Sequence, residues 1–149
     1  MAGAYPERIT KPEGIAAIIA DNRLGRKNKR GFYTYNEDKK DKPDPSIYPL
    51  INKSGSQEPL TLSEEEIVDR CNLVFVNESM RCLEDGILKT ASDGDVGAVF
   101  GLGFPPFLGG PFHYTKSQGT KNICERLNKL AEKYGERFKP ASILENNKF

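Results

Sequence analysis

The sequence predicts an all-α fold. An apolar stripe at helical spacing runs from about residue 64 to about residue 90, and it is too wide for a helix with one fully exposed face. A second segment, 115–134, gathers its apolar residues on one helical face, at Ile123, Leu127, Leu130, Ala131 and Tyr134. No segment alternates apolar and polar residues over a useful strand length. The chain of 149 residues is long enough to bury a core.

The first 35 residues are expected to hold one short helix and one extended segment. Residues 12–24 start with proline and glutamate, carry apolar residues at helical spacing and meet a natural stop at Gly25. Residues 32–35, Phe-Tyr-Thr-Tyr, form a short extended aromatic segment. Between them, residues 26–30 are the one short basic cluster, which is either a solvated turn or a contact with phosphate or an acidic partner.

Residues 36–62 have the composition of a linker. An Asp/Lys-rich run is followed by four prolines and by Ser-Gly-Ser at 54–56. Because proline lacks the N–H that a helix needs and clashes with the preceding turn, this density disfavours a helix. The apolar trio Ile47, Tyr48 and Leu50 is expected to pin the middle of the linker to the domain.

The longest helix is predicted from about Glu64 to about Thr90. Ser63 and Glu66 form a capping box, and glutamates at 64–66 favour the positive end of the helix. Gly86 weakens the last turns. Asn77 and Glu78 interrupt the apolar stripe, so this pair either hydrogen-bonds across to another element as a buried polar pair or faces water.

Further elements follow towards the C-terminus. Ser92 with Asp95 is predicted to cap a short helix of residues 93–100. A helix over 115–134 follows, with Gly135 as the residue after its end. The polar tail from residue 137 is anchored by Phe138, Ile143 and Leu144.

Residues 94–112 are the most unusual stretch of the chain. They hold six of the fourteen glycines and four of the eight phenylalanines, so the stretch is apolar where an ordinary surface loop is polar. An apolar loop with almost no reactive side chain predicts a packing surface that something covers. Its candidate packing residues are Gly101, Gly103, Phe104, Pro105, Pro106, Phe107, Gly109, Gly110, Pro111 and Phe112.

The bulk numbers exclude several classes of function. With 22 basic and 21 acidic residues, the chain lacks the basic surplus of a nucleic-acid-binding or anionic-membrane-binding protein. No apolar run approaches the roughly 20 residues of a membrane span, and the N-terminus lacks the apolar region of a secretory signal. The three cysteines, Cys71, Cys82 and Cys124, are expected to be reduced thiols of an intracellular protein.

The residue types also argue against chemistry in this chain. Gly101-x-Gly103 begins a dinucleotide-binding pattern, but Pro106 replaces its last glycine and offers no N–H to a phosphate. The single histidine, His113, lies between aromatic residues and is interpreted as structural. No paired carboxylates or metal-ligand spacings stand out. The sequence therefore predicts no catalytic, cofactor-binding or metal-binding residue.

Three motifs in order resemble a known family. They are Leu24–Tyr33, the helical string Glu66–Ile87, and the stretch Gly94–Phe112. The second and third resemble the extreme C-terminal domain of the multifunctional α subunit of fatty-acid β-oxidation, in its mitochondrial trifunctional or bacterial form. The first resembles the tail of the 3-hydroxyacyl-CoA dehydrogenase C-terminal domain that precedes it. The resemblance covers about residues 24–138 and implies a helical 3-hydroxyacyl-CoA dehydrogenase C-terminal-domain-like fold, of the 6-phosphogluconate dehydrogenase C-terminal-like type.

The resemblance implies a division of the chain and a place in a larger enzyme. Residues 1–35 would be the tail of a preceding helical dehydrogenase domain, 36–62 a Pro-rich linker, and 63–149 a second helical domain. The motifs begin close to Met1, so we expect a piece of a longer enzyme. In the family, a helix carries an Asn-Arg pair near the substrate; this chain has Asp69-Arg70 there, so no substrate role is carried over to residue 69.

The expected function is that of a non-catalytic helical module that supports packing and assembly of an NAD-dependent 3-hydroxyacyl-CoA dehydrogenase/enoyl-CoA hydratase. The resemblance implies NAD and acyl-CoA in the parent enzyme, and as partners its Rossmann and first helical domains and a thiolase (β) subunit. The location would be intracellular, mitochondrial in a eukaryote and cytoplasmic in a bacterium. The alternatives are a free-standing interaction domain that uses the Gly/Phe/Pro loop, and an acyl-CoA contact through residues 26–30.

Overall fold

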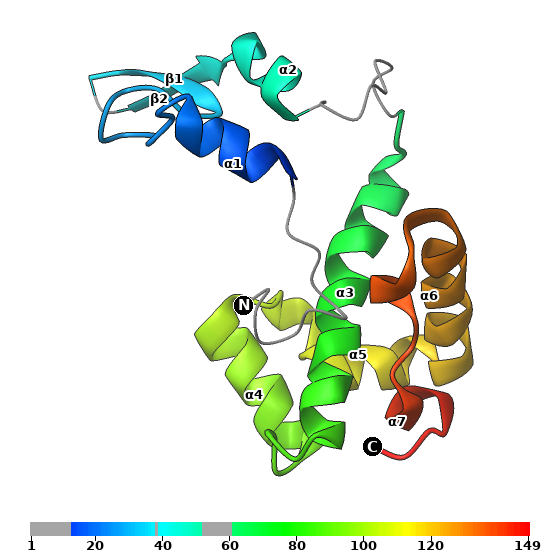
Figure 1. Ribbon diagram of the computed structural model, residues 1–149. Helices are drawn as coiled ribbons and strands as arrows, with labels where there is room; N and C mark the ends of the chain where they lie inside the picture. The colour runs from blue at the N-terminus through cyan, green and yellow to red at the C-terminus, as the bar shows by residue number, and fades with distance from the viewer. Residues whose placement is uncertain (1–12, 38, 52–60) are drawn as a thin grey trace. The chain divides into compact units, whose positions relative to one another are not determined.

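The computed structural model describes residues 13–37, 39–51 and 61–149 (Figure 1). The chain divides into two compact units, Met1–Leu60 and Thr61–Phe149, and each is described by itself. In the described residues the fold is mostly helical, which confirms the all-α prediction apart from one small hairpin. No helix in these ranges has the length and apolar character needed to span a bilayer.

The first unit contains a hairpin, of which the sequence predicted only the first, extended segment. After α1 (Glu13–Ala20), β1 (Tyr33–Asn36) pairs antiparallel with β2 (Lys39–Pro43). The turn η1 (Pro45–Ile47) and the short helix α2 (Tyr48–Ile51) follow. Residues 39–51 of the segment with linker composition therefore form a strand, a turn and a short helix. Its prolines are compatible with the helical turns because a proline in the first turn of a helix needs no hydrogen-bond partner for its nitrogen.

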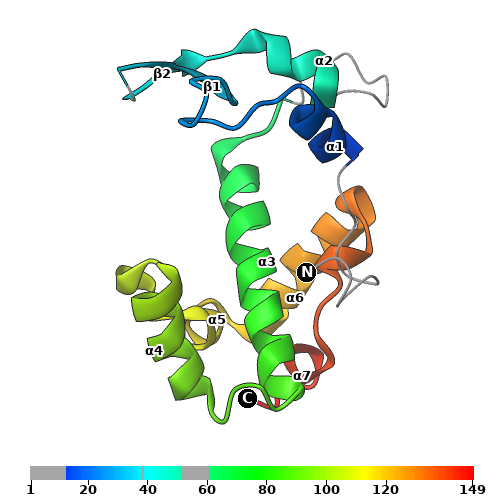
Figure 2. The ribbon, with the colours of Figure 1, turned by 60° about the vertical axis from the view of Figure 1, so that its left-hand side comes forward.

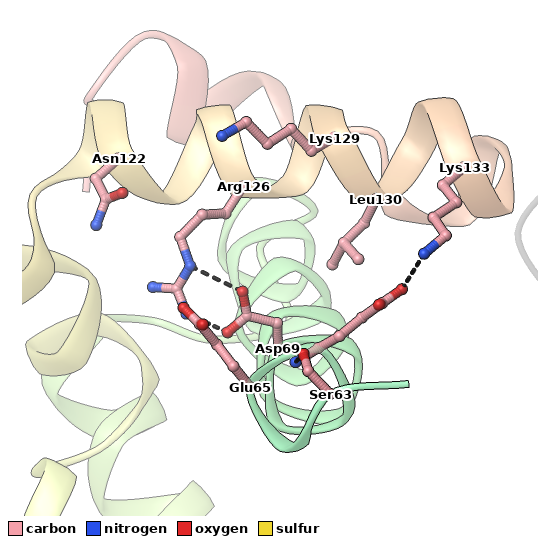
Figure 3. Close-up of a pocket in the computed structure, with 9 residues that line it drawn as sticks. Ser63, Glu65, Asp69, Asn122, Arg126, Lys129, Leu130 and Lys133 are labelled. Carbon is pink, nitrogen blue, oxygen red and sulfur yellow. Dashed lines mark hydrogen bonds and ion pairs between the residues drawn. The ribbon is translucent and has the colours of Figure 1, made fainter. Parts of the chain in front are cut away.

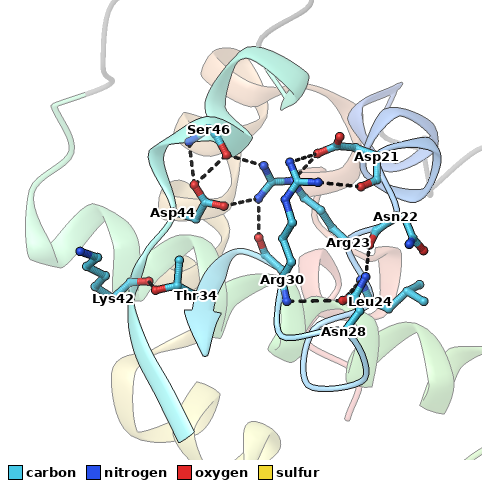
Figure 4. Close-up of polar contacts among 11 residues, drawn as sticks. Asp21, Asn22, Arg23, Leu24, Asn28, Arg30, Thr34, Lys42, Asp44 and Ser46 are labelled. Carbon is cyan, nitrogen blue, oxygen red and sulfur yellow. Dashed lines mark hydrogen bonds and ion pairs between the residues drawn. The ribbon is translucent and has the colours of Figure 1, made fainter. Parts of the chain in front are cut away.

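Arg23 holds the first unit together (Figure 4). Its side chain is fully buried; Nη1 donates to the Gly31 carbonyl and to Asp44, both at 2.7 Å, and Nε donates to Asp21 at 2.8 Å. Nη2 donates to the Ser46 hydroxyl at 2.5 Å. Hydrogen bonds from Ser46 and then from Arg23 lower the pKa of Asp44 to about 2. One cation thus connects the end of α1, the hairpin and η1.

The second unit is built around α3 (Glu64–Glu84). In both ribbon views α3 runs between α4 (Ala91–Leu102) on one side and α6 (Thr120–Tyr134) with α7 (Ser142–Glu145) on the other (Figures 1 and 2). The turn η2 (Pro106–Leu108) and α5 (Pro111–Gln118) connect α4 to α6, and η3 (Glu136–Phe138) follows α6. Helices on both sides of α3 make it the central helix, as predicted.

Helix α3 begins where the sequence predicted, but it ends several residues before the predicted end. The Ser63 hydroxyl accepts a hydrogen bond from the Glu66 N–H at 3.1 Å, which is the first half of the predicted capping box. The Glu66 carboxylate instead bonds to Lys133 and Tyr134 of α6. The helix stops at Glu84 rather than near residue 90, and Gly86 follows it with φ +72°.

Three other boundaries differ from the prediction. Thr90, not Ser92, caps α4 by accepting from the Asp93 N–H at 3.1 Å. The helix predicted over 93–100 is α4, which extends two residues further at each end, from Ala91 to Leu102. The helix predicted over 115–134 is two helices, because α5 begins at Pro111 and the chain turns at Gly119, whose φ is +84°. Gly135 follows the end of α6 as predicted.

The core of the second unit draws on every helix of that unit. Apolar side chains from α3, α5 and α6 meet those of the C-terminal segment and are shielded from solvent. The members buried most deeply are Leu73, Val76, Met80, Phe112, Ile123, Leu127, Phe138 and Leu144. The predicted anchors Phe138 and Leu144 are thus core residues, and Ile143 is half-buried beside them.

Candidate functional site

The apolar stretch 94–112 is divided between the protein's own core and its surface. Phe104 and Phe112 are buried, with exposed fractions of 3% and 1%, whereas Phe100 and Phe107 are each 87% exposed. Gly110 and Pro111 are buried as well. The expectation that this stretch is one exposed packing loop is therefore wrong in part, because half of its phenylalanines complete the core of their own unit.

The exposed part centres on one side of α4, which we call the α4 face: Val96, Gly97, Phe100 and Gly101. These residues stand at helical spacing, so they share one side of the helix, and all four are exposed. Phe107 of η2 and Leu102 at the end of α4 are also largely exposed. Large apolar side chains gathered on one side of a helix are characteristic of a contact surface.

The glycines of α4 separate core packing from surface contact. A Cβ added at Gly94 would lie 2.4 Å from the Phe112 ring, so this glycine is required by the core. A Cβ at Gly97 or Gly101 would meet nothing within 4 Å. Glycine within a helix costs about 0.5–1 kcal/mol relative to alanine. The fold of the unit therefore gains nothing from these two glycines, whereas a neighbour that approaches α4 closely would.

An apolar groove of about 330 Å³ lies beside the α4 face, between α3 and α4. Phe75, Leu88 and Leu102 line it together with Gly97, so the groove shares a residue with the α4 face. Ile87, which also lines the groove, is 62% exposed. The α4 face and the groove together offer both a protruding ring, Phe100, and a depression to an apolar partner.

Asp95 lies on the inner side of α4 and holds the start of α5. Its carboxylate accepts from the Phe112 N–H at 2.8 Å and from the His113 N–H at 3.1 Å. It thus caps α5, whose own N-cap residue, Gly110, has no side chain. The sequence interpretation, which gave Asp95 to the cap of a helix starting at residue 93, missed this role.

His113 faces a backbone carbonyl. Its Nδ1 lies 3.3 Å from the Leu108 oxygen. Within the described ranges no serine or cysteine side chain hydrogen-bonds to its ring, so a nucleophile–base pair is not assembled there. The Gly101-x-Gly103 pattern, which begins a dinucleotide-binding motif, lies at the C-terminal end of α4. A dinucleotide site requires such glycines between a strand and the start of a helix.

A polar groove of about 460 Å³ lies between the start of α3 and α6 (Figure 3). Arg126 of α6 donates two hydrogen bonds to the carboxylate of Asp69, one of them at 3.1 Å, and their side chains are 22% and 16% exposed. Lys133 donates to Glu66 at 2.6 Å. These two ion pairs join α3 to α6, and the partners neutralise each other's charge, so we interpret them as structural contacts and not as ligand-binding groups.

The pKa shifts in this groove follow from the same contacts. The hydrogen bond with Asp69 raises the pKa of Arg126. Hydrogen bonds from Lys133 and then Tyr134 lower the pKa of Glu66. The Arg70 guanidinium lies 4.1 Å from the centre of the Tyr134 ring. Asp69 and Arg70 therefore both contact α6.

The predicted polar pair of α3 is only half buried. Asn77 is fully buried; its Nδ2 donates to the Lys139 carbonyl at 2.7 Å, and its Oδ1 accepts from the Ala141 N–H at 2.8 Å. Glu78 is partly exposed and pairs with Arg81 at 3.4 Å, so the prediction of a buried pair is wrong for Glu78. Helix α3 turns these neighbours to different sides, and only Asn77 faces the C-terminal segment.

The remaining candidates for chemistry stay apart. In the part of the chain that the structure describes, no three side chains of His, Cys, Asp or Glu gather as metal ligands would. None of the three cysteines, all of which lie in the described ranges, forms a disulfide bond. Burial, with a smaller effect of Glu145, raises the pKa of the Cys124 thiol, which makes it a poorer nucleophile.

Comparisons with known proteins identify relatives of the chain. No family model matches it. It is 47% identical over 137 residues to "fatty acid oxidation complex subunit alpha" of Vibrio cholerae serotype O1, in strains O395 and N16961, and the match covers 92% of this chain. The chain spans only about a fifth (19%) of the length of these relatives.

A solved structure has the same fold. The crystal structure of the dehydrogenase part of multifunctional enzyme 1 from C. elegans matches with a TM-score of 0.66 over 98% of this chain and 35% of that one. The two are 23% identical in sequence, so this likeness concerns the fold.

Proposed function

The chain is homologous to one segment of the fatty acid oxidation complex alpha subunits, and we propose that it is a helical module that supports the 3-hydroxyacyl-CoA dehydrogenase of such an enzyme without supplying catalytic residues. The observation that carries the proposal is the α4 face, where exposed Phe100 stands beside two glycines that the fold itself does not need. A surface of this kind suits close packing against another domain.

The rest of the activity would lie outside this chain. We propose that NAD and acyl-CoA bind to the remaining part of the enzyme, in which a Rossmann domain and a first helical domain are the direct partners and a thiolase (β) subunit is a further one. The chain would be intracellular, in mitochondria or in the bacterial cytoplasm according to its source. The relatives' name supports the pathway, and the polar and apolar grooves of the second unit support a structural role.

The decisive experiment separates docking from catalysis. The chain is mixed with a Vibrio cholerae alpha subunit that lacks the matching segment, and binding is measured by calorimetry. We expect binding that Phe100→Asp abolishes. Val68→Asp, which places the same charge at an exposed apolar position of α3, should leave binding intact. The chain alone, given NAD and a 3-hydroxyacyl-CoA, should produce no NADH; turnover above background would overturn the non-catalytic role.

A second candidate is a free-standing interaction protein that associates with a copy of itself. The favouring observation is that Phe107 and Phe100 are both 87% exposed, which leaves a sticky surface on the isolated chain. Under this hypothesis the chain forms a concentration-dependent dimer that dissociates on Phe107→Asp. A strictly monomeric chain in analytical ultracentrifugation would count against it.

A further inference from the structure

The basic turn of the first unit has the properties of an anion site. We propose that residues 26–29, with the cations Arg26, Lys27 and Lys29, bind a small phosphate-bearing anion. The inference rests on the first unit alone and is independent of the docking role of α4. Two observations support the proposal. The turn is closed by its own hydrogen bonds, and its three cations form no ion pair with any acidic side chain that the structure describes.

Backbone hydrogen bonds join the two ends of the turn, and the Asn28 side chain makes further hydrogen bonds inside it (Figure 4). The Gly25 N–H donates to the Arg30 carbonyl at 2.9 Å, and the Arg30 N–H returns a bond to the Gly25 carbonyl at 3.1 Å. Inside this ring the Asn28 Oδ1 accepts from the Leu24 N–H at 3.2 Å, and its Nδ2 donates to the Asn22 carbonyl. A turn with these bonds keeps its shape without a ligand, which lowers the entropic cost of binding.

The buried Arg23 fixes the base of the turn to the rest of the unit. It precedes the turn, and its guanidinium bonds the Gly31 carbonyl just after it. It also pairs with Asp44 beyond the hairpin. The turn is thus carried on a buried, charge-compensated base.

Two acidic side chains of the unit, Asp21 and Asp44, form ion pairs with cations other than those of the turn. Asp21 pairs with Arg23 at 2.8 Å and with Arg30 at 3.0 Å, and Asp44 pairs with Arg23 at 2.7 Å. Arg26, Lys27 and Lys29 are exposed, and across the described ranges none of them has an ion pair. The turn therefore presents three positive charges that no described residue of the unit neutralises.

The compactness of this charge favours phosphate over an extended acidic segment. The three cations arise from four consecutive residues that reverse direction, with Lys29 in the left-handed region at φ +61°. The N–H groups of residues 26–29 have no backbone acceptor among the described residues, so they add donors at the same turn. Arginine offers a planar pair of donors that matches phosphate oxygens, and lysine adds point charge.

Inorganic pyrophosphate is the probe. It is titrated into the isotope-labelled full chain while backbone amide resonances are followed by NMR. We expect shifts confined to residues 25–31, and an affinity that falls about tenfold in the triple variant Arg26→Gln/Lys27→Gln/Lys29→Gln, since each exposed charge contributes modestly. The control Lys89→Gln/Lys121→Gln/Lys129→Gln removes the same charge from exposed positions of the second unit and should keep the affinity.

Two further observations make the test complete. Unchanged resonances around Arg23 and Asp44 in the triple variant establish that the unit remains folded. Flotation with vesicles of phosphatidylcholine, with and without phosphatidic acid, distinguishes a lipid headgroup from a soluble phosphate: binding only to the acidic vesicles assigns the first, and binding only to pyrophosphate assigns the second. The proposal would be overturned if pyrophosphate caused no shift at the turn and the chain did not float with the acidic vesicles, or if the two triple variants lost equal affinity.

Discussion

Asp95 of α4 lies directly against Gly110 and supplies the carboxylate that caps α5. A Cβ added at Gly110 would stand 2.4 Å from the Asp95 Oδ1, and Gly110 has a φ of +106°. The close approach lets one carboxylate reach two N–H groups, those of Phe112 and His113. The contact positions α4, and with it the α4 face, relative to the core.

Removal of the Asp95 carboxylate tests this cap. We expect Asp95→Ala to lower the free energy of unfolding by about 1–2 kcal/mol, because two N–H groups lose a charged acceptor. Chemical denaturation monitored by circular dichroism measures the change. Glu132→Ala, at an exposed position of α6, should stay within about 0.5 kcal/mol of the parent. Equal effects of the two substitutions would show that the cap does not stabilise α5.

A pair of glycine substitutions separates the close approach from backbone strain. Gly110→Ala meets both a positive φ and the Asp95 side chain, whereas Gly119→Ala meets a φ of +84° with nothing within 4 Å. Strain of this kind costs about 1–3 kcal/mol. Thermal unfolding should therefore show a larger loss for Gly110→Ala than for Gly119→Ala. A smaller loss at Gly110 would contradict the contact with Asp95.

The two classes of glycine in α4 should respond in opposite directions. Gly94→Ala places a methyl 2.4 Å from the Phe112 ring and 2.9 Å from Leu88, and overpacking of this kind costs about 1–3 kcal/mol. Gly97→Ala meets open space and should stabilise the isolated chain by about 0.5–1 kcal/mol through helix propensity. Denaturation curves of both variants supply the comparison, and a destabilised Gly97→Ala chain would argue against an open α4 face.

The Asp69–Arg126 pair should stabilise the fold more than a surface pair. Its side chains are mostly buried, so a double-mutant cycle with Asp69→Asn and Arg126→Gln should give a coupling of about 1–3 kcal/mol. The exposed pair Lys121–Glu125, at 4.0 Å, should give about 0.2–1 kcal/mol in the same experiment. A coupling no larger than that of the exposed pair would mean that the polar groove does not join α3 to α6.

Glu66 should make stability depend on acid pH. Lys133 and Tyr134 hold its pKa in the folded chain below its ordinary value of 4.5. A lowered pKa contributes stability that is complete above 4.5 and is lost as the pH falls from there through the folded value. Melting temperatures between neutral and acidic pH should fall less steeply in Glu66→Gln. Glu65→Gln removes a carboxylate from the same turn without these hydrogen bonds and should keep the parent's slope.

Much of the helical content could be predicted from local sequence. The Ser63 cap, the apolar face of 120–134 and the glycine at 135 act within one or two turns of the chain, so their effect is visible in the order of residues. In the stretch 94–112 the local sequence predicted the short helix over 93–100, but not that α4 extends to Leu102 or that α5 begins at Pro111. Nor could it predict the close packing of the Phe112 ring on Gly94, because these residues are distant along the chain.

The all-α class and the central place of α3 were determined by the sequence alone, because hydrophobic periodicity specifies which faces must be buried. The sequence alone also determined the small number of reactive groups and the resemblance to the β-oxidation α subunits, which the relatives confirm. Only the tertiary structure decided which phenylalanines are core and which are surface, and that Asp95 serves α5. Those outcomes depend on contacts between residues distant along the chain, and side-chain spacing within one helix carries no information about them.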